Sequence, residues 1–267
     1  MTDPFQDVDA TGPDFVETVT GVLESRAAEA QMVPVIERYL DRLDWSGDAL
    51  HVEVGCGTGP VARRMAARAG RGRVVGIDPS AGLIASARER AADHPNLAFE
   101  TGDGTALPFE PNAVRSIVMH TVLSHVPEPI PLLVEASRVL EPGGRLVVCD
   151  ADFAKSSLGN FDGDPLDACA TYFVRHFVTR PYVIAEIRGL VSSVGYDLED
   201  FRIDSRAMTD TDGGLGWIRL GGAQMVERGL VDEALVAALA NEYVRRKEAG
   251  TLYGHQPFGT LVAVKPG

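Results

Sequence analysis

The segment LHVEVGCGTGP, residues 50–60, places three glycines directly between a strand-like apolar run and a helical pattern. Gly55, Gly57 and Gly59 allow the chain to turn sharply and to lie close to a ligand, beside the free amides of a helix N-terminus. Asp78 ends the next apolar run, where a carboxylate can accept both hydroxyls of a ribose. A less favoured alternative is that Asp78 caps the helix that begins near Ser80. The segment therefore predicts a nucleotide site after the first strand, or a structural turn.

Strand and helix patterns alternate strictly after this point. Helical patterns at 60–70, 80–93 and 127–140 separate apolar runs at 73–78, 97–102, 114–120 and 145–152, with a turn expected at 141–144. Strands joined by helices of this length form a parallel sheet covered on both faces. The sequence predicts an α/β fold with a Rossmann-like, seven-stranded, mostly parallel sheet.

The remaining chain is mainly helical. Apolar spacing indicates helices at 14–43, 164–178, 181–195, 213–228 and 231–248, and strands at 197–208 and 252–266. No linker composition separates these segments. We expect a single domain, 1–267, with an N-terminal helical cap (1–47), a cofactor-binding core (48–152) and substrate-side helices with closing strands (153–267).

Charge limits the class of partner. The formal net charge is −13, which disfavours nucleic acid and anionic membranes. Three cysteines, Cys56, Cys149 and Cys169, lie in apolar or glycine-rich settings and indicate reduced thiols. With no signal peptide or spanning segment, we expect a cytoplasmic protein that acts on a small molecule. Whether it forms a homodimer is left open.

Two residues distinguish the ligand from a dinucleotide. A dinucleotide fingerprint needs its third glycine at position 60, where this chain has Pro60. Glu53, just before the glycines, is poorly placed for a pyrophosphate but suits an ammonium or sulfonium charge. An NAD(P)-dependent oxidoreductase is therefore the weaker alternative.

Several segments in order resemble the class I S-adenosylmethionine-dependent methyltransferases, most closely the ubiquinone/menaquinone-type group that acts on small molecules. They are VEVGCGTG, GIDPS, GDGTALPF, SIVMHTVLSHVPEP and VLEPGGRLVV. The resemblance implies that S-adenosyl-L-methionine is the cofactor, that Asp78 binds its ribose and that Asp103 with the Gly104 amide contacts its adenine. The cofactor-binding set that it implies is Glu53, Gly55, Cys56, Gly57, Gly59, Asp78, Pro79, Gly102, Asp103, Gly104 and His120.

Methyl transfer from a sulfonium is an in-line displacement, so the protein must align the reactants and exclude water. A base is needed only where the acceptor must lose a proton. His125 and His120 are the candidates, although His125 could instead fix its loop and His120 could border the cofactor. Asp150 and Asp152 lack a third ligand, so we expect no metal.

The acceptor pocket is expected between the N-terminal segment and the late helices. Candidate contacts are Phe5, Phe15, Phe153, Tyr172, His176, Trp217, Tyr253 and His255. The function predicted is methyl transfer to a small apolar or aromatic metabolite, with oxygen, nitrogen or carbon as acceptor. Two alternatives remain: a methyltransferase-fold protein that catalyses cyclisation or rearrangement, and a nucleic-acid or protein methyltransferase, which charge disfavours.

Overall fold

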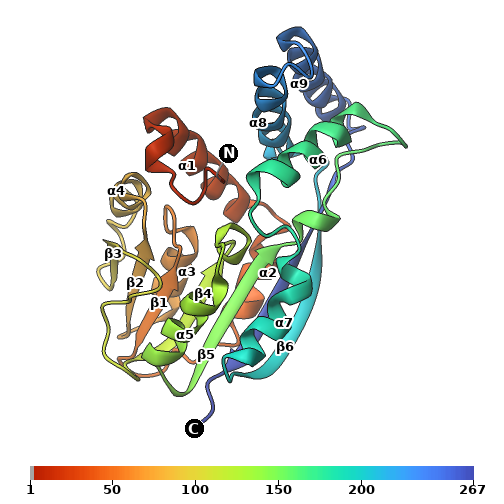
Figure 1. Cartoon of the computed structure of the whole chain (residues 1–267). Helices are drawn as coiled ribbons and strands as arrows, with labels where there is room; N and C mark the ends of the chain where they lie inside the picture. Colours follow the sequence, from red (N-terminus) through yellow and green to blue (C-terminus); the bar gives the residue numbers. More distant parts are fainter. Residues whose placement is uncertain (1–2) are drawn as a thin grey trace.

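A computed structural model describes residues 3–267, and within them one mixed sheet forms the centre of the molecule (Figure 1). Its strands run in the order β3-β2-β1-β4-β5-β7-β6. The first five strands are parallel, and β7 is antiparallel to both β5 and β6. The predicted seven-stranded, mostly parallel sheet is confirmed. The strands are β1 (Leu50–Val54), β2 (Arg73–Asp78), β3 (Leu97–Thr101), β4 (Val114–His120), β5 (Leu140–Ala151), β6 (Asp197–Ala207) and β7 (His255–Val264).

Helices cover both faces of this sheet. On one face, α2 (Val33–Leu40), α3 (Pro60–Arg68) and α4 (Ala81–Glu89) share one apolar cluster. On the other face, α5 (Pro129–Val139) and α7 (Val183–Ser193) share a second cluster. Because both faces are covered, central strands such as β4 are buried along almost their whole length.

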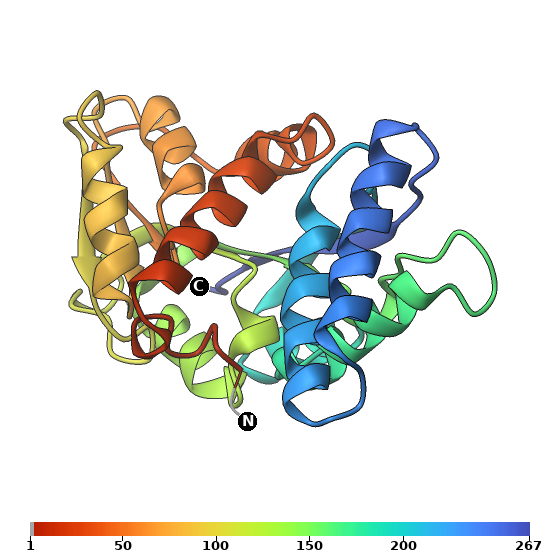
Figure 2. The ribbon, with the colours of Figure 1, turned by 90° about the horizontal axis from the view of Figure 1, so that it is seen from above.

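The remaining helices stand over the edge where the parallel strands end (Figure 1). They are α1 (Pro13–Ala28), α6 (Pro165–Phe177), α8 (Gly213–Glu227) and α9 (Glu233–Glu248), and short 3-10 turns lie at Asp9–Thr11, Leu123–His125 and Phe153–Lys155. From above, α1 runs beside α4 and faces α8 and α9 across the molecule (Figure 2). The N-terminal and the late helical segments thus lie over the same end of the sheet. The division of the chain into one domain of three parts stays a prediction.

Two boundaries differ from the sequence prediction. Residues 141–144 were expected to form a turn, but β5 already begins at Leu140. Pairing with β4 jumps from Val114↔Leu140 to Ser116↔Arg145, and Gly143 takes φ +79° within this irregularity. Residues 252–254 lie before β7, because the Tyr253 amide donates to the Asn160 side chain instead of to a strand.

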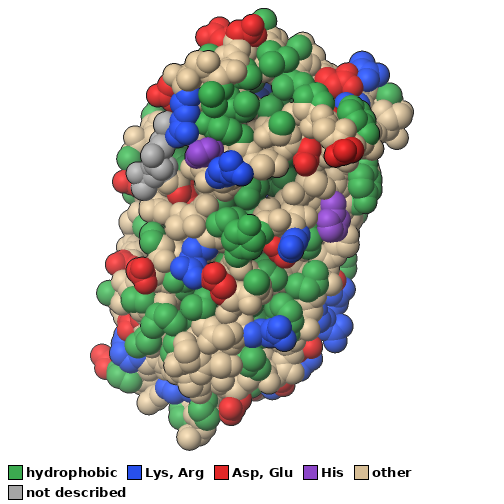
Figure 3. Space-filling view, turned by 45° about the vertical axis from the view of Figure 1, so that its right-hand side comes forward, with side chains coloured by type: hydrophobic (Ala, Val, Ile, Leu, Met, Phe, Trp, Pro, Cys, Tyr) green, Lys and Arg blue, Asp and Glu red, His purple; other side chains and the backbone are tan. Residues whose placement is uncertain are grey.

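Acidic and basic side chains are interspersed over the face shown in Figure 3, with no continuous basic stripe. Within residues 3–267, no helix combines the length and apolarity needed to cross a membrane.

Candidate functional site

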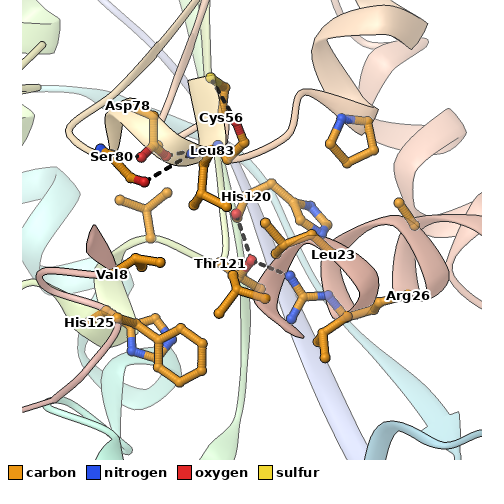
Figure 4. Close-up of a pocket in the computed structure, with 18 of the residues that line it drawn as sticks. Val8, Leu23, Arg26, Cys56, Asp78, Ser80, Leu83, His120, Thr121 and His125 are labelled. Atoms are coloured by element: carbon orange, nitrogen blue, oxygen red, sulfur yellow. Dashed lines mark hydrogen bonds between the residues drawn. The ribbon is translucent and has the colours of Figure 1, made fainter. Parts of the chain in front are cut away.

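A cavity of about 980 Å³ lies at the ends of β1, β2 and β4, where parallel strands typically present their ligand sites. The loops after these strands form its floor. The strap (residues 3–12, which precede α1), α1 itself and α8 form its roof and far wall. Segments far apart in sequence therefore enclose a single space (Figure 4).

The first two glycines of the loop make room for this cavity. Gly55 has φ +69°, and a Cβ there would lie 2.5 Å from Val122 Cγ2. Gly57 has φ +53°, and its Cβ would lie 2.5 Å from Leu23 Cδ1. Gly59 is different: it faces the Phe99 ring and does not line the cavity. Its requirement for glycine comes from packing and from φ +76°.

Asp78 is held at the cavity wall by two backbone donors. Its Oδ2 accepts the Gly57 N–H at 2.8 Å and its Oδ1 accepts the Ser80 N–H at 2.9 Å. Ser80, and not Asp78, is the N-cap of α4. A carboxylate has about four acceptor positions, so free positions remain for two ribose hydroxyls. Burial raises the pKa of Asp78 despite these donors.

Glu53 brings a second buried carboxylate to the same wall. Its Oε2 has no hydrogen-bond partner among the described residues. Burial raises the pKa of Glu53 well above its usual value, and the neighbouring Asp78 charge raises it further. A buried, unsatisfied carboxylate oxygen is costly unless a cation meets it. Glu53 is therefore suited to the ammonium end of a ligand.

The other residues expected to hold the cofactor lie around these two acids. Asp103 is exposed at the rim, and its Oδ1 accepts the Thr105 N–H at 2.8 Å. Cys56 is buried, and burial raises the pKa of its thiol, so it provides surface and no nucleophile. The members of the expected set that line the cavity are Glu53, Gly55, Cys56, Gly57, Asp78, Pro79, Gly102, Asp103, Gly104 and His120.

His120, at the end of β4, has a well-defined partner. Its Nδ1 lies 3.1 Å from the Tyr39 hydroxyl. Burial, followed by the nearby Arg26 charge, lowers the pKa of His120 to about 3, so the ring is neutral at ordinary pH. No other acceptor for the Tyr39 hydroxyl occurs in the described chain, so we assign the hydroxyl as donor to Nδ1. The remaining ring proton then sits on Nε2.

His125 is linked to the strap. Its Nδ1 lies 2.8 Å from Asp3 Oδ2, which also accepts the Thr179 N–H and hydroxyl. The Phe5 ring packs against the imidazole with centroids 4.7 Å apart, and Phe153 meets it edge-on. His125 lines the cavity. Its side chain is thus fixed by residues from the strap and from the 3-10 turn at Phe153–Lys155.

The structure divides the expected acceptor contacts into two groups. Phe5, Phe153 and Trp217 line the cavity. Tyr172 and His176 instead pack on each other outside it, at 4.3 Å between ring centroids. The other three also lie outside the cavity lining: Phe15 packs on Phe5, Tyr253 is exposed, and His255 Nε2 contacts the Ser205 hydroxyl.

Several residues that line the cavity or hold its cover in place were missed by sequence reasoning. Asp9 of the strap accepts the Ser80 hydroxyl at 2.6 Å and the Ala81 N–H at 2.7 Å, and so ties the strap to the start of α4. Arg26 on α1 donates to the Thr121 hydroxyl at 2.7 Å. Thr121 itself has φ +56°, an uncommon value for a residue with a side chain. No local sequence signal marks these contacts, because each joins segments that only folding brings together.

Comparison with known proteins agrees with this geometry. A methyltransferase-domain family model matches residues 52–148. The chain is 36% identical over 119 residues to a 2-phytyl-1,4-naphtoquinone methyltransferase of Thermosynechococcus vestitus, covering 44% of this chain and 53% of that protein. The chain spans about a third to about half of the curated relatives that it matches.

Solved structures resemble the fold over a greater length. Geranyl diphosphate C-methyltransferase of Streptomyces coelicolor superimposes with a TM-score of 0.56 at 19% identity, covering 87% of this chain and 80% of that one. The [4+2]-cyclase SpnF superimposes with a TM-score of 0.60 at 21% identity, covering 98% and 97%. At these identities the likeness concerns the fold.

The strand order and the glycine loop define a Rossmann-like fold of the methyltransferase type. Residues 52–148 are identified more closely: they form a class I S-adenosylmethionine-dependent methyltransferase domain. The residues present fit that cofactor, because the unsatisfied Glu53 oxygen would accept its ammonium group and the free acceptor positions on Asp78 would accept its ribose hydroxyls.

Proposed function

We propose that this protein transfers the methyl group of S-adenosylmethionine to a small metabolite with an apolar or aromatic body. The observation that carries the proposal is the pair of buried carboxylates, Glu53 and Asp78, beside the glycine loop inside the cavity. A buried acid with a free oxygen favours a cationic ligand over a pyrophosphate. The methyltransferase-domain match over residues 52–148 supports the same conclusion.

The bound cofactor would supply an activated methyl group on sulfur. The protein's own contribution is alignment and exclusion of water. The strap and α1 cover the cavity, and Asp9 closes the strap onto α4. Phe153 and Trp217 would hold the acceptor, because their rings line the cavity and lie 6.2 Å apart between centroids.

His125 is our candidate for the general base. Asp3 accepts its Nδ1 proton, which leaves Nε2 as the free acceptor, and this arrangement is the usual one for a catalytic imidazole. His120 has the opposite arrangement, with Nδ1 occupied as an acceptor by Tyr39. We therefore assign His120 a hydrogen-bonding role at the cavity wall and leave the base role to His125.

The direct test combines binding and turnover. Calorimetry should detect S-adenosylmethionine and S-adenosylhomocysteine but not NAD. Incubation of the protein and cofactor with metabolite extracts should give a product heavier by one methylene than its precursor. Tight binding of NAD without binding of S-adenosylmethionine would overturn the proposal.

A second candidate is cofactor-dependent cyclisation or rearrangement without methyl transfer. It is favoured by the likeness to the [4+2]-cyclase, which extends over nearly the whole of both chains. The same extract experiment separates the two. A product isomeric with its precursor, and no labelled methyl group in it, would support the cyclase over the methyltransferase.

A further inference from the structure

Arg26 places a cation in the cavity wall with little to compensate it. It projects from α1 toward the end of β4, close to His120 and Thr121 (Figure 4). Its only hydrogen bond in the described chain runs from Nη2 to the Thr121 hydroxyl, and no described carboxylate lies within ion-pair distance of it. A guanidinium has five N–H donors, so most of this group's hydrogen-bonding capacity is unused.

The neighbouring Arg206, in contrast to Arg26, has hydrogen-bond partners for all three nitrogens of its guanidinium. Its Nε and Nη2 donate to the two oxygens of Glu29, each at 2.6 Å, and its Nη1 donates to Gln256 at 2.7 Å. Glu29 is thus committed to Arg206. Asp150, the other acid near Arg26, accepts the Ser124 and Ala151 amides. Neither acid neutralises Arg26.

Burial and the nearby Arg206 charge lower the pKa of Arg26 to about 10. The guanidinium still carries its charge at neutral pH, and its environment disfavours that charge. A sulfonium bound in the same cavity would add a second positive charge, and the repulsion is strong in a poorly solvated space. An anion placed between Arg26 and the sulfonium would stabilise the buried Arg26 charge. It would also reduce the repulsion between the two cations.

The position of Arg26 indicates which ligand brings that anion. The charged groups that act on Arg26 are Arg206, Asp150 and Glu29, which belong to the β5–β6 side and the end of α1. The charges that act on Glu53 are Asp78 and Arg63, on the β1–β2 side. Arg26 and Glu53 therefore have different charged neighbours. Arg206, the cation beside Arg26, contacts Gly213 at the start of α8, the helix that carries Trp217. Trp217 and Phe153, the proposed acceptor contacts, line the same cavity as Arg26.

We infer that the acceptor is an amphiphilic acid, whose carboxylate or similar anionic oxygen group binds Arg26 while its apolar body packs against Phe153 and Trp217. This inference rests on the proposed function for the location of the acceptor. Arg26 acts as an anchor that orients the acceptor, while the His120 Nε2–H offers a second, neutral donor nearby.

The test compares acids with their uncharged analogues. The probes are benzoate, naphthalene-2-carboxylate and anthracene-2-carboxylate, each paired with its primary amide, added to protein saturated with S-adenosylhomocysteine. Binding is followed by calorimetry and by quenching of Trp217 fluorescence, with Trp45→Phe removing the other indole. At least one acid should bind about tenfold or more tightly than its amide in low salt, as expected for a charge-assisted contact.

Variants then assign the preference to Arg26. Arg26→Gln should abolish the preference for the acid and leave S-adenosylhomocysteine affinity within about twofold, and Arg26→Lys should retain part of the preference. Arg38→Gln, which removes an exposed guanidinium paired with Asp204, is the matched control. Thermal unfolding confirms that each variant folds.

Two outcomes would overturn the inference. One is the absence of any acid preference in the wild-type protein. The other is a large loss of S-adenosylhomocysteine affinity in Arg26→Gln with the acid preference intact, which would assign Arg26 to the cofactor's own carboxylate. Failure of the proposed function is distinguishable, because the acid preference would persist in a protein that transfers no methyl group.

Discussion

Asp3 Oδ2 lies 2.8 Å from His125 Nδ1, and so a residue at the start of the strap orients an imidazole that follows β4. The Asp3 side chain is only 3% exposed and also accepts two hydrogen bonds from Thr179. The contact joins the strap to the turn after β4, so movement of the strap away from the cavity would break it. Closure and orientation of the candidate base are therefore linked.

The first prediction concerns this pair. Asp3→Asn should lower kcat by about tenfold to a hundredfold, because a misoriented base loses part of its usual contribution. His125→Ala should lower kcat at least as much. In the His125→Ala background, Asp3→Asn should have almost no further effect on kcat. Steady-state kinetics of the two single variants and the double variant check this; additive losses would show that Asp3 acts independently of His125.

The second prediction concerns the ribose site. Asp78→Ala should weaken binding of S-adenosylhomocysteine by about 1.5–3 kcal/mol, through loss of charge-assisted hydrogen bonds. Asp93→Ala, which changes an exposed acid in the turn before β3, is the control. Calorimetry gives both affinities. Unchanged affinity in a folded Asp78→Ala protein would mean that the ribose assignment is wrong.

The third prediction follows from the pKa of Glu53, which burial raises well above the ordinary value of 4.5. Below that ordinary value the side chain is protonated in both the folded and the unfolded chain and does not affect stability. As pH rises above it, only the unfolded chain ionises, so the free energy of unfolding falls. Without cofactor, Glu53→Gln should therefore be more stable than wild type at neutral pH, with the difference shrinking toward about pH 4.

Denaturant unfolding at several pH values measures this difference. The same substitution should weaken cofactor binding, because Gln has no negative charge to pair with the ammonium group. Wild-type binding should also release protons, which calorimetry detects as a dependence on buffer ionisation enthalpy. A cofactor-free Glu53→Gln variant that is less stable than wild type at neutral pH would contradict the prediction.

The fourth prediction concerns His120. Burial lowers its pKa to about 3, against 6.5 for the ordinary side chain. As pH falls below 6.5 the unfolded chain gains a proton that the folded chain does not, so stability present at neutral pH is lost toward acid pH. Long-range ¹H–¹⁵N spectra at about pH 6 should show a neutral ring protonated on Nε2. Tyr39→Phe should remove that tautomer preference; a ring protonated on Nδ1 in the wild type would disprove the assignment.

The fifth prediction tests the closure of the strap. Asp9→Ala removes the acceptor of the Ser80 hydroxyl and of amides at the start of α4. Loss of such a helix-terminal acceptor costs about 0.5–2 kcal/mol. We expect faster proteolysis of the strap and weaker cofactor binding, while Asp48→Ala, at an exposed turn, changes neither. Equal protection of both variants would show that Asp9 does not hold the strap.

The sequence by itself determined the sheet and the position of the glycine loop with the two acids beside it. The alternation of apolar runs and helical patterns fixes a parallel core, and the GCGTG segment with Asp78 fixes where a ligand meets it. These features are local: a glycine with φ +69° at position 55, or a carboxylate at the end of β2, follows from neighbours in the chain. Glu53, Gly55, Gly57 and Asp78, all expected near the ligand from the sequence, line the cavity in the structure.

Only the tertiary structure decided which distant segments line the rest of the cavity. Arg26 on α1 and Trp217 on α8 line it, and Asp3 contacts the cavity residue His125. Helical spacing alone cannot tell which face of a cap helix is covered. The same limit explains why Tyr172 and His176 were expected at the cavity but pack outside it. An unpaired guanidinium such as that of Arg26 indicates an anion-binding site only when every nearby acid is engaged by other groups. Whether those acids are engaged depends on contacts between residues distant in sequence.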